Sequence, residues 1–199
     1  IKTQGYIHNV VTAVPTEYFF RSGSPDELLI HGESQSEILT RYLEWPKNRI
    51  KLIKSFMRPL KIDEYFQYIY LPFQIENFNS VFILFENLIM NSTKNHFKNL
   101  KVKIHPNNLE DKKNINYKRR LDELLEKYKN KFSDKNYKEK TSFVFGFSSL
   151  IFQLLENEQT IIQISSIPEL EVCGQRSGYW KNLKVDEINK GVYFYSLNK

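Results

Sequence analysis

Two short apolar runs of this 199-residue chain end in residues that could hold an anion. The run "KVKIHP" ends in His105 and Pro106, and the run "TSFVFGFSS" contains Gly146 and ends in Ser148 and Ser149. An imidazole N–H and serine hydroxyls donate hydrogen bonds that phosphate oxygens accept. These residue types therefore favour a phosphate site, of the kind that a nucleotide occupies.

The residues around these side chains predict where the runs end. Pro106 favours extended geometry at His105 and stops a strand there, while Gly146 permits a tight turn or a close backbone approach. Ser148 and Ser149 would then open a helix, whose first N–H groups attract anions. Each residue also has a structural interpretation: a hydrogen-bonded strand end for His105, a turn for Gly146 and a helix cap for Ser148.

The pattern of apolar residues predicts alternating strands and helices. Runs rich in β-branched and aromatic residues indicate strands at 5–11, 26–32, 49–56, 68–73, 102–106, 142–147, 160–166 and 191–197. Apolar stripes at helical spacing indicate helices at 34–45, 79–97, 117–132 and 148–158. In the first of these helices, Ser34 and Glu37 have the spacing of a capping box.

This alternation predicts an α/β fold that is Rossmann-like, with a largely parallel sheet and helices on both faces. We expect residues 1–60 to be the end of an N-terminal α/β domain with a linker, and residues 61–199 to form a Rossmann-like nucleotide-binding domain. The linker is expected at 57–67, where periodicity is lost around Pro59. In such sheets ligands bind beyond the carboxyl ends of the strands, so both motifs are expected at one crevice.

Absent motifs exclude several classes of protein. The sequence contains no G-x-G-x-x-G, no P-loop and no G-x-S-x-G nucleophile elbow. Cys173 is the single cysteine, so an intrachain disulfide is impossible and a reducing compartment fits best. The four histidines are scattered and no Asp-x-Asp occurs, so we expect a phosphate site without a metal.

The net charge of +6 comes mainly from lysines, many of them between residues 94 and 140. This run fits a solvated surface, and it also permits attraction to phosphate groups or to an anionic membrane surface. Acidic residues alternate with the lysines, so nucleic acid is not expected as a partner. The longest apolar stretches are interrupted by charge well before the roughly 18–20 residues that a membrane span needs.

The order of segments resembles that of bacterial surface-polysaccharide glycosyltransferases with the GT-B architecture, which include capsule, lipopolysaccharide, sialic-acid and Kdo transferases. The stretches "TQGYI", "SPDELLIHGESQSEIL" and "EWPKNRIKLIKSFMR" match this family in turn, and "IYLPF" resembles the strand that opens its second domain. The His-Pro strand end and the Ser-Ser helix start resemble the two motifs that hold the CMP-sugar in bacterial sialyltransferases.

The resemblance implies a C-terminal, nucleotide-binding portion of a glycosyltransferase in surface-polysaccharide biosynthesis. Its donor would be a nucleotide-sugar, with a CMP-sugar favoured and no other cofactor, and its acceptor a glycan or a lipid-linked molecule. His105 would be catalytic, stabilising the departing phosphate. Pro106, Gly146, Ser148 and Ser149 would complete the nucleotide and phosphate site with His105.

The resemblance also implies a cytoplasmic protein, with peripheral association at the inner face of the membrane. Arg58 is a further candidate contact at the crevice. The sequence departs from the family pattern where Gly5 directly follows Gln4, without a histidine between them. No acidic residue matches the family's base convincingly, since Glu17 and Glu33 fit surface or capping roles. We therefore expect the base on a segment that precedes Ile1.

Two groups of alternatives stay open at this point. A GT-B-like sugar-nucleotide epimerase or a glycerophosphotransferase would use the same residues around a phosphate. A non-catalytic α/β module would instead dock through its lysine-rich helix on an anionic membrane surface or on a partner.

Overall fold

The computed structural model describes residues 1–7, 16–54, 66–75, 77–92, 97–133, 141–146, 148–166 and 182–197. The chain divides into two compact units. The first lies mainly within Ile1–Arg58, and the second mainly within Pro59–Glu171 and Val185–Leu197. Most of the predicted linker lies outside the described residues.

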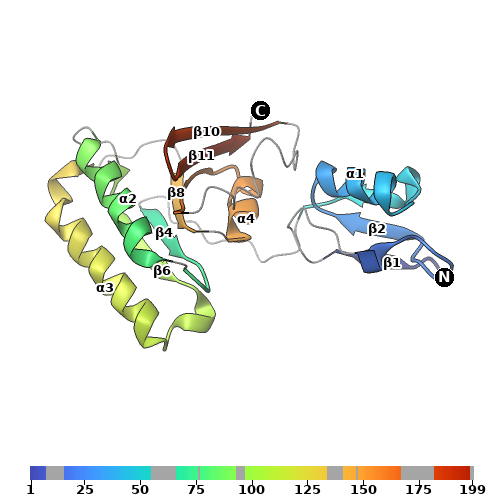
Figure 1. Ribbon diagram of the computed structural model, residues 1–199, viewed down its shortest axis with the longest axis horizontal. Coiled ribbons are helices and arrows are strands. Elements are labelled where there is room, and N and C mark those ends of the chain that lie inside the picture. The colour runs from blue at the N-terminus through green and yellow to red at the C-terminus, as the bar shows by residue number, and fades with distance from the viewer. Residues whose placement is uncertain are drawn as a thin grey trace. The chain divides into compact units, whose positions relative to one another are not determined.

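The first unit contains a small parallel sheet covered by a helix (Figure 1). Its described strands are β1 (Gln4–Tyr6), β2 (Glu27–Ile30) and β3 (Ile50–Leu52), in the order β1-β2-β3, and its helix is α1 (Glu33–Tyr42). Leu28 and Ile30 of β2 pack with Leu39 of α1, and Leu43 and Trp45 extend this core. Alternate side chains of β2 therefore point toward the face of the sheet that α1 covers.

Helix α1 begins earlier than the sequence predicted. Its N-cap is Gly32, and the side-chain oxygen of Gln35 accepts hydrogen bonds from the backbone N–H groups of His31, at 3.0 Å, and Gly32, at 3.3 Å. The predicted capping box of Ser34 and Glu37 is therefore wrong. Gln35, the third residue of the helix, instead satisfies the N–H groups of the N-cap and of the residue before it, because its long side chain can reach back over the first turn.

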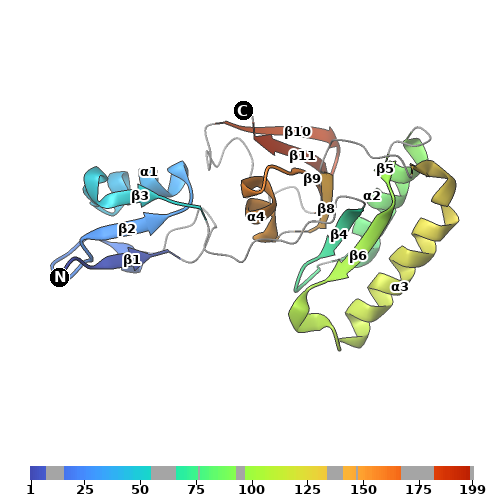
Figure 2. The same cartoon turned by 180° about the vertical axis from the view of Figure 1, so that it is seen from behind.

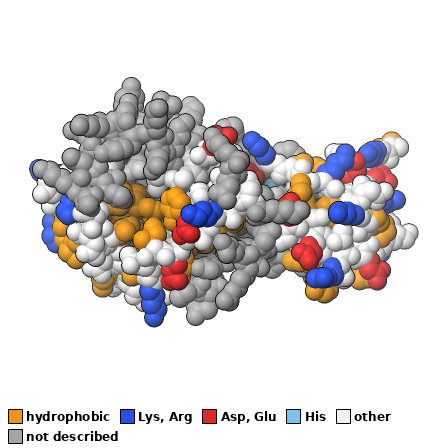
Figure 3. Space-filling view, turned by 90° about the horizontal axis from the view of Figure 1, so that it is seen from above, with side chains coloured by type: hydrophobic (Ala, Val, Ile, Leu, Met, Phe, Trp, Pro, Cys, Tyr) orange, Lys and Arg blue, Asp and Glu red, His pale blue; other side chains and the backbone are white. Residues whose placement is uncertain are grey.

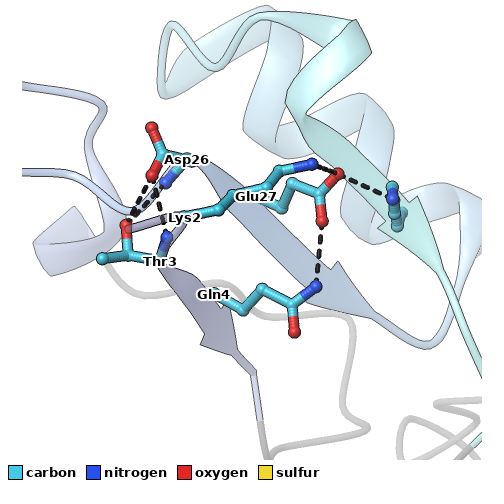
Figure 4. Close-up of polar contacts among 6 residues, drawn as sticks. Lys2, Thr3, Gln4, Asp26 and Glu27 are labelled. Carbon is cyan, nitrogen blue, oxygen red and sulfur yellow. Dashed lines mark hydrogen bonds and ion pairs between the residues drawn. The ribbon is translucent and has the colours of Figure 1, made fainter.

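The carboxylate of Glu27 joins the three strands on the other face of this sheet (Figure 4). It accepts from Lys2 Nζ at 2.7 Å, from Lys51 Nζ at 2.6 Å and from Gln4 Nε2 at 2.9 Å. The Glu27 residue is only 6% exposed. The hydrogen bonds from Lys2, Lys51 and Gln4 lower the pKa of Glu27 to about 2.

This pKa predicts how the first unit responds to acid. A carboxyl whose pKa is lower in the folded state stabilises the fold above its unfolded pKa, and that contribution is lost as the pH falls through the folded value. We therefore expect the free energy of unfolding to fall between about pH 4.5 and pH 2. Urea titrations of wild type and Glu27→Gln across this range would test it. Glu37→Gln, at an exposed carboxyl of α1, is the control and should keep the wild-type slope. An unchanged slope in Glu27→Gln would contradict the assignment.

The described strands of the second unit form a six-stranded, mostly parallel sheet in the order β10-β11-β9-β8-β4-β6. They are β4 (Gln67–Leu71), β6 (Leu100–Ile104), β8 (Thr141–Phe145), β9 (Thr160–Ile164), β10 (Leu183–Asn189) and β11 (Val192–Leu197). Strand β4 pairs in parallel with β6 and β8, and β8 with β9, whereas β11 is antiparallel to β9. The short strands β5 (Phe97–Lys98) and β7 (Phe132–Ser133) pair separately. The unit is therefore a mixed α/β structure.

Helices cover both faces of this sheet (Figures 1 and 2). Helices α2 (Phe78–Asn91) and α3 (Lys112–Lys127) lie on one face, and the short α4 (Leu150–Glu156) lies on the other. Phe85 of α2 is fully buried and meets the rings of Phe143 and Phe145 of β8 edge-on, at 5.6 and 5.2 Å. Leu121 and Leu124 of α3 join the same core.

Most of the observed elements correspond to predicted ones, but several differ in their bounds. Helix α2 ends at Asn91 rather than at 97, and Phe97 and Phe132, which were predicted at helix ends, lie in the strands β5 and β7. Helix α3 begins at Lys112 rather than at 117, because the Asp111 side chain accepts from the backbone N–H of Lys113 at 3.1 Å and caps the helix there. Strand β10 was not predicted. Most of its residues are exposed, so it lacks the apolar pattern of a buried strand.

Gly191 in the β10–β11 turn has a φ of +81°, and a Cβ built there would lie 2.6 Å from the Ser165 carbonyl oxygen and 2.9 Å from Leu84 Cδ1. We expect Gly191→Ala to cost more than about 2 kcal/mol in unfolding free energy, because a backbone clash adds to the roughly 1–2 kcal/mol of left-handed strain. Gly23→Ala is the matched control: its φ is +91°, but nothing lies within 4 Å. Equal costs in urea unfolding would contradict this prediction.

Candidate functional site

The winding order of the second unit defines a switch point at β4. The chain passes from β4 to its neighbour β6 on one side, and then to β8 and β9 on the other side. All four strands are parallel, so their carboxyl ends lie at the same edge of the sheet. In open α/β sheets this edge, at the reversal of strand order, is where ligands bind.

His105 lies directly after the carboxyl end of β6, where the sequence predicted it. Pro106 begins a short 3₁₀ turn, Pro106–Asn108, and His105 has an extended backbone with a φ of −57° and a ψ of 136°. The half-buried imidazole accepts at Nδ1 from the backbone N–H of Asn107, at 3.2 Å. A neutral imidazole that accepts at Nδ1 carries its proton at Nε2, so Nε2–H is the group that can donate to an anion.

Phe73, beyond the neighbouring strand β4, and Asn108, in the same turn as His105, support this histidine. The ring of Phe73, two residues beyond β4, meets the His105 ring edge-on at 5.6 Å and is 52% exposed. The buried Asn108 side chain donates from Nδ2 to the Phe73 carbonyl oxygen at 2.6 Å. The turn after β6 is thereby attached to the loop after β4. The sequence analysis did not single out either residue, although "YLPF" places an aromatic residue at the end of the predicted strand 68–73.

Gly146 follows β8, on the other side of β4, and has a φ of +69°. Its backbone N–H donates to the Ile164 carbonyl oxygen at 2.6 Å, and its own carbonyl oxygen accepts from Gln163 Nε2 at 2.9 Å. Gln163 is buried and accepts in turn from the hydroxyl of the buried Tyr195, at 2.7 Å. The turn that begins at Gly146 is therefore fixed from β9 and β11.

Ser148 and Ser149 open helix α4, and both are half-buried. Ser148 Oγ accepts from the backbone N–H of Leu150 at 3.3 Å, so it has a capping role. Its hydroxyl hydrogen remains able to donate to another acceptor. Ser149 is the N-cap residue and makes no capping hydrogen bond with its side chain. Arg58, the remaining candidate, lies outside the described residues.

The two motifs reach the same edge of the sheet but are separated by one strand. Since β4 lies between β6 and β8, the strands that carry His105 and Ser148 are about 10 Å apart, twice the usual spacing of neighbouring strands. A ligand held by both motifs must extend across the end of β4. Phe73 lies at that end.

The lysine-rich helix α3 carries its charges mostly in ion pairs. Lys118 pairs with Asp122 and Arg119 with Glu123, and Lys127 pairs with Glu86 of α2, at 2.9 Å. On the face drawn in Figure 3, basic and acidic side chains are interspersed and do not gather by sign. This arrangement favours a solvated helix surface over a basic docking surface.

Two further properties concern the described residues alone. No helix in this part of the chain has the length and apolar character that crossing a bilayer requires. Within the same segments, no three His, Cys, Asp or Glu side chains group in a way that could hold a metal ion.

Comparison with models of protein families finds no matching family, and comparisons with curated proteins and with solved structures find no matching protein and no matching structure. A function for this chain is therefore inferred from its topology and from the residues at the switch point.

The buried hydrogen bonds behind Gly146 predict an energetic coupling. Tyr195→Phe removes the donor to Gln163, and we expect a loss of about 1–3 kcal/mol in unfolding free energy, because a buried acceptor is left unsatisfied. Gln163→Met removes the partner, and the double variant should cost less than the sum of the two single changes. Tyr42→Phe, at a 64% exposed tyrosine, is the control and should stay within about 0.5 kcal/mol of wild type. Strictly additive effects in urea unfolding would contradict the coupling.

Proposed function

We propose that the second unit binds the nucleotide of a sugar donor at the carboxyl edge of its sheet, across the end of β4. The observation that carries this proposal is the strand order β6-β4-β8-β9, which puts His105 on one side of the switch point and Gly146, Ser148 and Ser149 on the other. A nucleoside phosphate has both the anionic group and the length that this arrangement requires.

Each side chain has a role in this proposal that follows from its hydrogen bonds. His105 donates from Nε2–H to a phosphate oxygen, because its Nδ1 is already occupied as an acceptor. Ser148 donates its hydroxyl hydrogen to the same group while it keeps its bond from Leu150. Phe73 offers an exposed ring beside His105, against which a base or a sugar can pack.

In this proposal the chain is the donor-binding part of a glycosyltransferase that builds surface polysaccharide. Negative charge develops on the phosphate oxygens as the bond between the donor phosphate and the anomeric carbon breaks. Donors that are already oriented toward these oxygens stabilise that charge and lower the barrier. His105 would thus be the catalytic residue, and a CMP-sugar is the favoured donor because of the resemblance of its two motifs to those of sialyltransferases. The acceptor would be a glycan or a lipid-linked molecule.

A thermal-shift titration of the full chain with CMP, CDP, UMP, UDP, GDP and ADP tests the proposal. A nucleotide at a hundredfold excess over its Kd should stabilise the binding unit by about 2.7 kcal/mol. His105→Ala should weaken binding about tenfold to a hundredfold, because a hydrogen bond to a charged group contributes roughly 1.5–3 kcal/mol.

Phe73→Ala should also weaken nucleotide binding, through loss of the exposed ring. Ile83→Ala is its matched control: this α2 residue is 56% exposed, and its removal should leave the shift unchanged. Stabilisation by CMP above the other nucleotides would support a CMP-sugar donor. A folded wild type that no nucleotide stabilises, or equal shifts in wild type and His105→Ala, would refute the proposed site.

A further inference from the structure

A cleft of about 750 Å³ lies within the first unit, apart from the residues assigned to the nucleotide. Ligand-binding pockets for small molecules typically enclose about 300–1,000 Å³. The cleft is formed by β1, by the turn Thr16–Tyr18 and the segment that follows it, and by Trp45 beyond α1. All of its described lining residues belong to this unit.

The walls of the cleft are held by hydrogen bonds and by close packing. Arg21 and Ser24 form a turn in which the Ser24 N–H donates to the Arg21 carbonyl oxygen and the Arg21 N–H donates to Ser24 Oγ, both at 2.9 Å. The indole N–H of Trp45 donates to the Tyr18 carbonyl oxygen. Gly5 lies so close to Pro25 that a Cβ there would be 2.8 Å from the proline ring. These contacts fix the cleft before any ligand enters it.

Aromatic rings and opposite charges line the same space. The half-buried Tyr6 and Tyr18 provide ring surfaces, and the exposed side chains of Glu17 and Arg21 provide a carboxylate and a guanidinium. Trp45 also borders the cleft but is buried, at 4% exposed, and supports its wall. A carbohydrate ring has an apolar C–H face that packs on aromatic rings, and hydroxyls that both donate and accept. A carboxylate accepts from such hydroxyls and a guanidinium donates to them. The carboxylate would repel a polyphosphate, which distinguishes this cleft from the switch point.

We propose that the cleft of the first unit is a carbohydrate-binding site, in which Glu17 and Arg21 bind sugar hydroxyls and the aromatic residues pack against the ring. This site goes beyond the proposed nucleotide site and shares no residue with it. Its existence does not require that the second unit binds a nucleotide.

Saturation-transfer NMR on the full chain tests this proposal, with methyl β-galactoside, methyl α-glucoside, N-acetylglucosamine and N-acetylneuraminic acid as separate probes. We expect at least one of these sugars to give a transfer signal that Glu17→Gln and Arg21→Ala each reduce at least threefold. Both side chains are exposed, so the variants should fold, and their circular dichroism should match wild type.

Matched control variants lie on α1. Glu37 and Arg41 form an exposed ion pair at 3.2 Å outside the cleft, so Glu37→Gln and Arg41→Ala make the same charge changes elsewhere on this unit. The sugar signal should persist in both controls. CMP serves as a second ligand on the same samples, and its signal should be unaffected by Glu17→Gln.

The possible outcomes separate the two sites. A sugar signal that Glu17→Gln and Arg21→Ala reduce, and His105→Ala leaves unchanged, supports the carbohydrate site even if CMP does not bind. Absence of a signal for all four sugars overturns it, and so does a signal that persists in both cleft variants. A sugar signal that only His105→Ala removes also overturns it, because the sugar would then bind at the second unit.

Discussion

The double pairing of β4 is the constraint on which the candidate nucleotide site depends. All five residues of this strand are buried, and it bonds to β6 along one edge and to β8 along the other. Because these pairings are parallel, the loops that follow the three strands come to one edge of the sheet. Residues separated by more than forty positions in the sequence, such as His105 and Ser148, therefore face the same region. The parallel pairing of β4 with β6 and β8 is what brings these two residues to the same edge of the sheet.

Side-chain hydrogen bonds then set the local geometry that the sheet alone does not determine. Asn108 attaches the turn after β6 to the Phe73 carbonyl, and Gln163 attaches the turn after β8 to β9 and, through Tyr195, to β11. Buried amides of this kind are costly unless they are satisfied, and both are. The polar side chains within the sheet thus support the loops at its edge.

The sequence predicted most of the second unit because its strands carry strong local signals. "FVF" and "IIQI" are apolar runs bounded by turn residues, and Pro106 and Gly146 mark where strands end for reasons that lie in their own covalent structure. The order of strands was not predictable in this way, because pairing depends on contacts between distant residues. It was the strand order that placed β4 between the two motifs.

Three features that the sequence did not predict also have physical causes: the cap of α1, strand β10 and the cleft of the first unit. Gln35, not Ser34, serves the start of α1, since a glutamine three residues into a helix can cap it without the usual N-cap side chain. Strand β10 has an exposed, charged sequence and forms because β11 offers it a partner edge. The cleft of the first unit combines residues from β1, the following segment and Trp45, and no spacing in the sequence brings these together.

The hydrogen bonds at Gly146 also bear on the entropy of binding. Its N–H donates to the Ile164 carbonyl oxygen and its own carbonyl oxygen accepts from the Gln163 side chain, so Gly146 has little conformational freedom left to lose when a ligand arrives. A loop that becomes ordered only on binding loses conformational entropy, and this loss reduces the free energy of binding. The Gly146 amide hydrogen should exchange with solvent only when the β8–β9 pairing opens, at a rate that reflects the stability of the sheet and not the mobility of a surface loop.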